Sequence, residues 1–154
     1  MGGVDLHQVG VFEHDWLWGI PLIAVTVVAH VLGLGLIRRL FDGAFAQVPH
    51  GKPRHLLGFA SVMGVAVTLT TILHLGQALI WALAYLWLGA LPDFRAAAIY
   101  SLNALTSFGH TRLALAPEWE ILGALEALNG IMMFTLSGAF LFGMIQRAWP
   151  TRDE

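Results

Sequence analysis

The chain has 154 residues, of which 57% are hydrophobic and only 12% are charged, and its formal net charge is −2. With its strongly positive mean hydropathy, this composition indicates an integral membrane protein and excludes an ordinary soluble domain. The chain contains no cysteine, so disulfide bonds, thiolate metal sites and cysteine-based catalysis are excluded. We expect no enzymatic activity, no resident metal or cofactor, and no nucleic-acid partner.

Three stretches are apolar and long enough to cross a bilayer, which takes about 20 residues. They run near residues 16–37, 57–88 and 119–145. Asp5, Glu13 and Asp15 precede the first stretch and no Lys or Arg does, which is unlike a cleavable signal peptide. We therefore expect the first stretch to remain in the mature protein as a transmembrane helix.

Basic residues predict the orientation of these spans. Six of the eight fall on one side, namely Arg38, Arg39, Lys52, Arg54, Arg147 and Arg152. By the positive-inside rule that side is cytoplasmic. We expect a multi-pass protein of a bacterial inner membrane with its N-terminus outside and its C-terminus in the cytoplasm, so that the segment between the second and third spans faces outward.

His30 and His74 lie near the middle of the first and second spans, at one depth if the two spans are antiparallel. Two imidazoles at one depth could ligate a haem from opposite sides, which would make the chain a membrane haem protein. The alternative is that both are hydrogen-bonded packing residues, the commoner role where no further ligand spacing supports a cofactor.

Residues 96–113, AAAIYSLNALTSFGHTRL, lie between two long apolar stretches but are too short and too polar to cross the bilayer. Non-helical backbone at membrane depth is tolerated only where it is buried in protein or lines a water-filled path. The segment therefore predicts a re-entrant loop at a pore or cavity. Pro92 and Asp93 predict the start of a short helix near 94–106, since both residues suit a first helical turn.

Residues 100–113, YSLNALTSFGHTRL, resemble the pore helix and selectivity filter of the potassium-channel superfamily, whose usual form is close to YFSLVTxTTVGYGD. Where the family has GYGD, this chain has GHTR. The resemblance extends over residues 82–145, and the last part of that range is similar to the inner helix of bacterial two-helix pore modules. The resemblance assigns the filter to Thr106, Ser107, Phe108, Gly109, His110 and Thr111.

This resemblance implies a homotetramer around a four-fold axis, because one chain cannot close a ring of filter carbonyls. The expected fold is an all-α membrane protein with three transmembrane helices, a re-entrant pore helix and a filter loop. Residues 56–154 would form the pore module, and residues 1–55 would add the first helix and a cytoplasmic loop. The implied function is conduction of monovalent cations, with K⁺ or Na⁺ in the pore and lipid around the tetramer.

The departures from the family pattern argue against potassium selectivity. Thr111 is β-branched at a position where glycine normally adopts a positive φ, so we expect the outer filter to leave the potassium geometry. Arg112 places positive charge at the pore mouth, which Glu118 and Glu120 could neutralise. The alternative function is a non-conducting structural or sensor homologue that kept the tetrameric scaffold.

The third span combines small and polar residues. Gly123, Gly130 and Gly138 are seven and eight positions apart, a spacing that lets helices approach closely. In the resembled inner helix, Gly130 would instead be the hinge at which a pore bends open.

Glu126 and Asn129 lie on the outer half of the same span. An ionisable residue at such a depth indicates a functional site or a buried network. We expect Glu126 to contact the pore helix near Asn103.

Overall fold

The computed structural model describes residues 6–45, 54–109 and 113–148. Every regular element within these ranges is a helix. The elements are α1 (Leu6–Phe45), α2 (Arg54–Trp87), α3 (Phe94–Leu105), the single-turn 3-10 helix η1 (Pro117–Trp119) and α4 (Glu120–Ala148).

Three of these helices, α1, α2 and α4, are long and apolar enough to cross a membrane. The prediction of an all-helical chain with three such helices is therefore confirmed. The largest difference from the predicted spans is in α1, which begins ten residues before Trp16 and ends eight residues after residue 37. Hydropathy marks the part of a helix that suits lipid rather than the ends of its backbone hydrogen bonding. The predicted short helix over 94–106 is confirmed to within one residue at its end.

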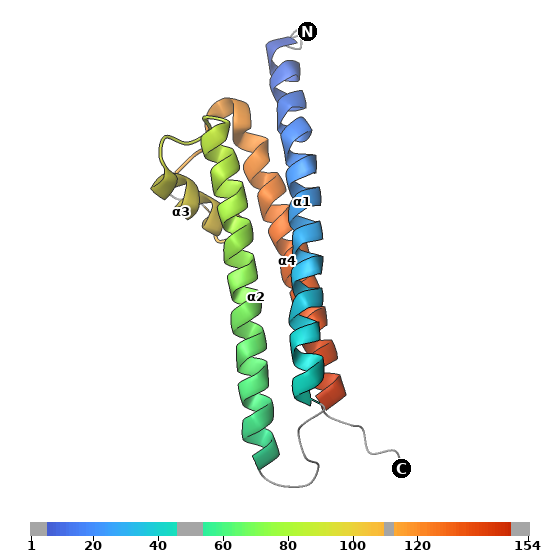
Figure 1. Cartoon of the computed structure of the whole chain (residues 1–154). Helices are drawn as coiled ribbons and strands as arrows, with labels where there is room; N and C mark the ends of the chain where they lie inside the picture. The colour runs from blue at the N-terminus through green and yellow to red at the C-terminus, as the bar shows by residue number, and fades with distance from the viewer. Residues whose placement is uncertain (1–5, 46–53, 110–112, 149–154) are drawn as a thin grey trace.

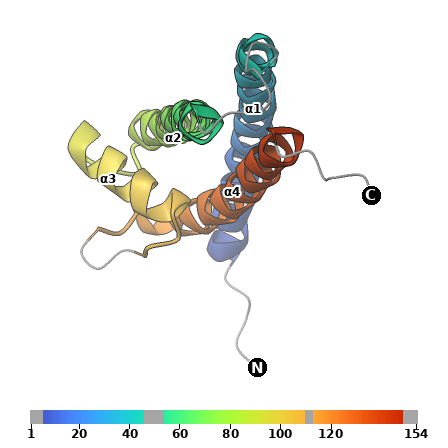
Figure 2. The ribbon, with the colours of Figure 1, turned by 90° about the horizontal axis from the view of Figure 1, so that it is seen from below.

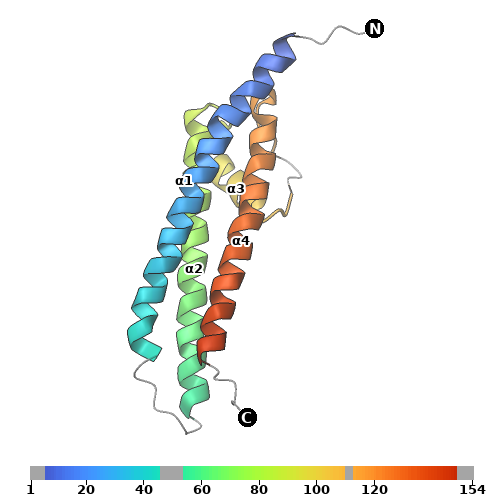
Figure 3. The ribbon, with the colours of Figure 1, turned by 90° about the vertical axis from the view of Figure 1, so that its right-hand side faces the viewer.

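The long helices lie side by side, and α3 packs against α2 and α4 on the side away from α1 (Figures 1 and 2). Seen from the side, α1 crosses the other two long helices obliquely (Figure 3). Gly19 allows this crossing, because a Cβ atom there would overlap the Leu125 side chain. Close approach through small residues is a usual way for membrane helices to pack.

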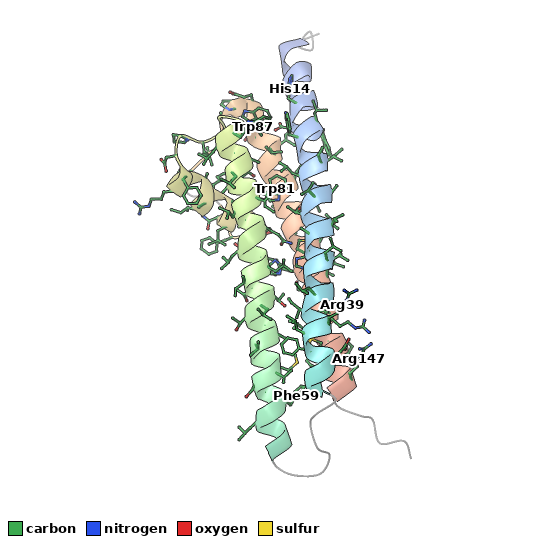
Figure 4. All side chains as sticks on the ribbon, viewed as in Figure 1. His14, Arg39, Phe59, Trp81, Trp87 and Arg147 are labelled. Atoms are coloured by element: carbon green, nitrogen blue, oxygen red, sulfur yellow. The ribbon has the colours of Figure 1, made fainter. Side chains whose placement is uncertain are left out.

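The two ends of the bundle differ in what they bury (Figure 4). The end that carries His14 and Trp87 is called the loop end, because α3 and the segments around it lie there. The end that carries Arg39 and Arg147 is called the arginine end. The apolar core of the loop end is built on residues such as Trp81, Tyr85, Tyr100 and Leu122. The apolar core of the arginine end consists of Leu34, Ile37, Phe41, Ala66 and Met144.

Candidate functional site

The short helix α3 is capped at both ends by local hydrogen bonds. At its start, Asp93 Oδ1 accepts a hydrogen bond of 2.9 Å from the backbone N–H of Ala96, which confirms the predicted helix start. At its end, the N–H groups of Ser107 and Phe108 donate to the carbonyls of Ala104 and Asn103, at 2.9 and 3.0 Å. With Ser107 at a φ of +53°, this is a Schellman cap.

The segment that contains α3 leaves and rejoins the long helices at the same end of the bundle. The backbone N–H of Ala116, just before η1, donates a hydrogen bond of 3.2 Å to the carbonyl of Ala90, just after α2. This bond joins the two sides of the segment. The excursion from α2 to α4 therefore begins and ends at one level, and α3 lies beside the loop-end half of the bundle (Figure 1).

Two glycines of α4 set how closely α3 approaches. A Cβ atom on Gly123 would overlap the Tyr100 hydroxyl, and one on Gly130 would overlap the backbone carbonyl of Leu105. The predicted close approach at these positions is confirmed, and its partner is α3. Gly138 is different, since nothing lies within 4 Å of a Cβ atom built there. No close helix contact forms at Gly138 within the described residues, and its role in helix packing stays a prediction.

Glu126 is fully buried and links three helices. Its Oε2 accepts a hydrogen bond of 2.5 Å from the Tyr85 hydroxyl of α2, and its Oε1 lies 2.5 Å from the Ser101 hydroxyl of α3. The same Ser101 oxygen lies 2.7 Å from the carbonyl of Ala78. The prediction that Glu126 contacts the short helix is confirmed, although the contact is with Ser101, and Asn103 uses its carbonyl in the helix cap.

The hydroxyl of Ser101 has two acceptors within reach. It can donate to Glu126 Oε1 or to the carbonyl of Ala78, while the Tyr85 hydroxyl donates to Glu126 Oε2. Two hydroxyl protons therefore serve three short oxygen–oxygen contacts. A protonated Glu126 that donates to Ser101 would supply the third proton, and this neutral acid is a prediction that can be tested.

A second polar network lies deeper in the bundle and ties α1 to α2 and α4. Asn129 Nδ2 donates to Thr26 Oγ1 at 2.8 Å. Gln77 Nε2 lies 3.4 Å from the carbonyl of Thr26 and 2.7 Å from His30 Nδ1. All four residues are buried, and Thr26 and Gln77 were missed by the sequence analysis. Their only sequence signal is that they are uncharged polar residues inside apolar spans.

His30 and His74 meet at Ser137, which the sequence analysis also missed. His30 Nε2 lies 2.9 Å and His74 Nε2 lies 3.0 Å from the Ser137 hydroxyl, and the ring centroids are 5.0 Å apart. With the Gln77 amide nitrogen facing His30 Nδ1, the matching tautomer of His30 carries its proton on Nε2 and can donate to Ser137. Ser137 can then donate to His74. Both Nε2 atoms are engaged with Ser137, as in hydrogen-bonded packing, whereas His74 Nδ1 is buried without a hydrogen-bond partner among the described residues. The haem alternative stays a prediction.

The predicted filter follows α3 directly. Thr106, Ser107, Phe108 and Gly109 are all exposed in the single chain, and Phe108 reaches 81% exposure. His110, Thr111 and Arg112 lie outside the described residues. Glu118 and Glu120, the predicted partners of Arg112, are exposed where α4 begins. The functional roles of these residues stay predictions.

The chain was compared with known protein families, curated proteins and solved structures. No protein-family model, no curated protein and no solved structure matches the chain.

Proposed function

We propose that this chain is one subunit of a homotetrameric pore-loop channel that conducts monovalent cations with little preference for K⁺ over Na⁺. It would lie in a bacterial inner membrane with its loop end outside and its arginine end in the cytoplasm. Residues 106–111 of four copies would line the outer part of the ion path. Arg112, Glu118 and Glu120 would lie around its mouth.

The observation that carries this proposal is the placement of α3. A helix of 12 residues is too short to span a bilayer. It is nevertheless held beside the loop-end halves of α2 and α4, in a segment whose two sides are joined by the Ala116–Ala90 bond. If the long helices span the membrane, α3 lies inside its outer half. That is the arrangement a re-entrant pore helix requires.

The exposed surface of α3 and its cap favours assembly with further copies. Leu102 is 43% exposed and Phe108 is 81% exposed, while the opposite face of α3 is buried against α2 and α4. The exposed residues 106–109 follow directly and are not helical. Non-helical backbone at membrane depth is tolerated only where protein or water covers it, not lipid. In a ring of four subunits, these residues would surround a water-filled path on the four-fold axis.

One feature favours the non-conducting alternative as a second candidate. A pore helix can stabilise a cavity ion with the free carbonyls at its C-terminal end. Here the carbonyls of Asn103 and Ala104 already accept hydrogen bonds from the cap. With these groups engaged, the helix would offer less to a cation, as expected of a structural or sensor subunit that kept the scaffold.

Mass measurement in mild detergent and flux from proteoliposomes separate these possibilities. The proposal expects a tetramer, and comparable K⁺ and Na⁺ currents under bi-ionic conditions. A tetramer that passes neither ion favours the structural subunit, and a stable monomer overturns both. The variant Gly130→Leu should abolish flux by displacing α3. Gly138→Leu is the matched control, because the space around Gly138 is open within the chain.

A further inference from the structure

The arginine end holds a hollow that neither the pore nor the polar networks use. It lies between the last turns of α1 and α4 and has a volume of about 230 Å³. Its walls combine charged and apolar side chains, among them Arg38, Phe41, Asp42, Gly143, Met144 and Arg147. From this combination we propose that the hollow binds one anionic phospholipid, with the phosphate at the arginines and part of an acyl chain against the apolar wall.

The charge of the hollow suits an anion. Two guanidinium groups and one carboxylate line it, which leaves a net positive charge. Arg147 Nη1 lies 3.7 Å from Asp42 Oδ1, and both side chains are more than half exposed. An exposed pair at this distance contributes little to stability. A lipid phosphate can therefore recruit Arg147 and Arg38 together, and guanidinium groups bind phosphate oxygens in a two-pronged geometry.

The apolar wall distinguishes a lipid from a free anion. Phe41 and Met144 belong to the buried core of the arginine end, so the hollow reaches from that core to the charged rim. Gly143 keeps it open, because nothing lies within 4 Å of a Cβ atom built there. An occupant with a charged head and a hydrocarbon chain matches both parts. Inorganic phosphate matches only the rim.

The position of the hollow fits the same occupant. It lies at the end of two helices that are long and apolar enough to span a membrane, beside a further exposed arginine, Arg39. Basic side chains at the cytoplasmic ends of membrane helices attract anionic lipid, and each one that contacts the headgroup adds about five-fold to binding. The inference needs the helices to lie in a membrane, but it does not depend on ion conduction.

Binding can be measured by native mass spectrometry of the purified full-length protein in neutral detergent. The added probes are phosphatidylglycerol, phosphatidylcholine of the same chain length, and glycerol phosphate. We expect one tightly bound phosphatidylglycerol, at least ten-fold weaker phosphatidylcholine, and no retained glycerol phosphate. Equal binding of the two lipids would overturn the proposal. Equal retention of glycerol phosphate would show that the hollow binds a phosphate group without an acyl chain, and this would overturn the proposal of a lipid site.

Matched variants locate the site. Arg38→Gln and Arg147→Gln should each weaken phosphatidylglycerol binding about five-fold, and Asp42→Asn should strengthen it by removing the competing carboxylate. Arg39→Gln removes the same charge from the neighbouring position outside the hollow and should change binding much less. Gly143→Leu should block binding by filling the space, whereas Gly138→Leu should not. Equal losses in Arg39→Gln and Arg38→Gln, or unchanged binding in Gly143→Leu, would contradict the proposal.

Discussion

The loop end and the arginine end are built from similar apolar helices but are held together differently. At the loop end, hydrogen bonds between buried polar side chains join two or three helices, as those of Glu126 with Tyr85 and Ser101 do. At the arginine end, the core around Ile37 and Met144 is apolar, and the charged pair Arg147–Asp42 lies at its surface. Among the described residues, both short helices, α3 and η1, lie at the loop end.

This difference shows what positions α3. Lipid tails are as apolar as the helices, so hydrophobicity alone gives no preferred rotation or depth between helices in a membrane. Hydrogen bonds and glycine contacts do, because each needs a particular pair of atoms. The loop end therefore has a defined geometry where the proposed filter begins, whereas the arginine end leaves a hollow.

The largest effect is expected from Gly130→Ala. The added methyl group would overlap the carbonyl of Leu105, which is backbone and cannot rotate away. We expect α3 to move and the free energy of unfolding to fall by about 3 kcal/mol. Unfolding in detergent by denaturant, followed by circular dichroism, measures this loss. Gly138→Ala is the control, and an equal loss there would show that glycine itself, rather than the contact with α3, is responsible.

A smaller loss is expected from Glu126→Ala, which leaves two buried hydroxyl groups with fewer partners. We expect a cost of about 2 kcal/mol in the same unfolding measurement. If Glu126 is a neutral acid, Glu126→Gln should be close to the wild type, because an amide can accept from Tyr85 and donate to Ser101 as the acid would. The infrared band of a protonated carboxylic acid should be present in the wild type and missing in Glu126→Gln. A wild type without that band would contradict the neutral acid.

Removal of one hydroxyl from the deeper network should cost less again. Ser137→Ala separates His30 from His74, and we expect the free energy of unfolding to fall by about 1 kcal/mol. Thr135→Ala on the same helix is the matched control. Its hydroxyl is exposed and bonds only to the carbonyl of Ile131 in its own helix. If both variants lose the same amount, the pairing of the histidines does not stabilise the bundle.

The smallest predicted effect has the opposite sign. Ser107 adopts a left-handed backbone conformation that glycine tolerates better. Ser107→Gly should therefore stabilise the cap of α3 by about 0.5 kcal/mol, detectable as slower amide hydrogen exchange in α3. Ser107→Ala keeps the strained backbone and should show no gain. Faster exchange in Ser107→Gly would mean that the serine side chain holds the cap.

Features that depend on local sequence were predictable. Asp93 follows Pro92 at the start of a short segment between long apolar stretches, and this pattern alone located α3. The three long helices were located by hydropathy, which also depends only on the local sequence. Glu126 could be assigned to a buried contact because an acid inside an apolar span needs partners.

The identity of those partners was not predictable. Which atoms meet depends on how each helix is rotated and how far it is shifted along its neighbours. The long helices are apolar on all sides, so periodicity does not reveal that rotation. Tyr85, Gln77 and Ser137 therefore looked like ordinary residues of apolar spans. The residues of the GHTR motif remain beyond this comparison, since three of them lie outside the described part of the chain.

The contact between Asp15 of α1 and the start of α4 matters for the order in which the helices are synthesised and inserted. Its buried carboxyl group lies against the backbone N–H groups of Ile121 and Leu122, in the first turn of α4. Those N–H groups have no partner within their own helix. The ribosome produces α1 before α4, so the acceptor that completes the first turn of α4 is in place before that helix emerges. A chain shortened from its N-terminus past Asp15 would have to insert α4 with that turn unfinished.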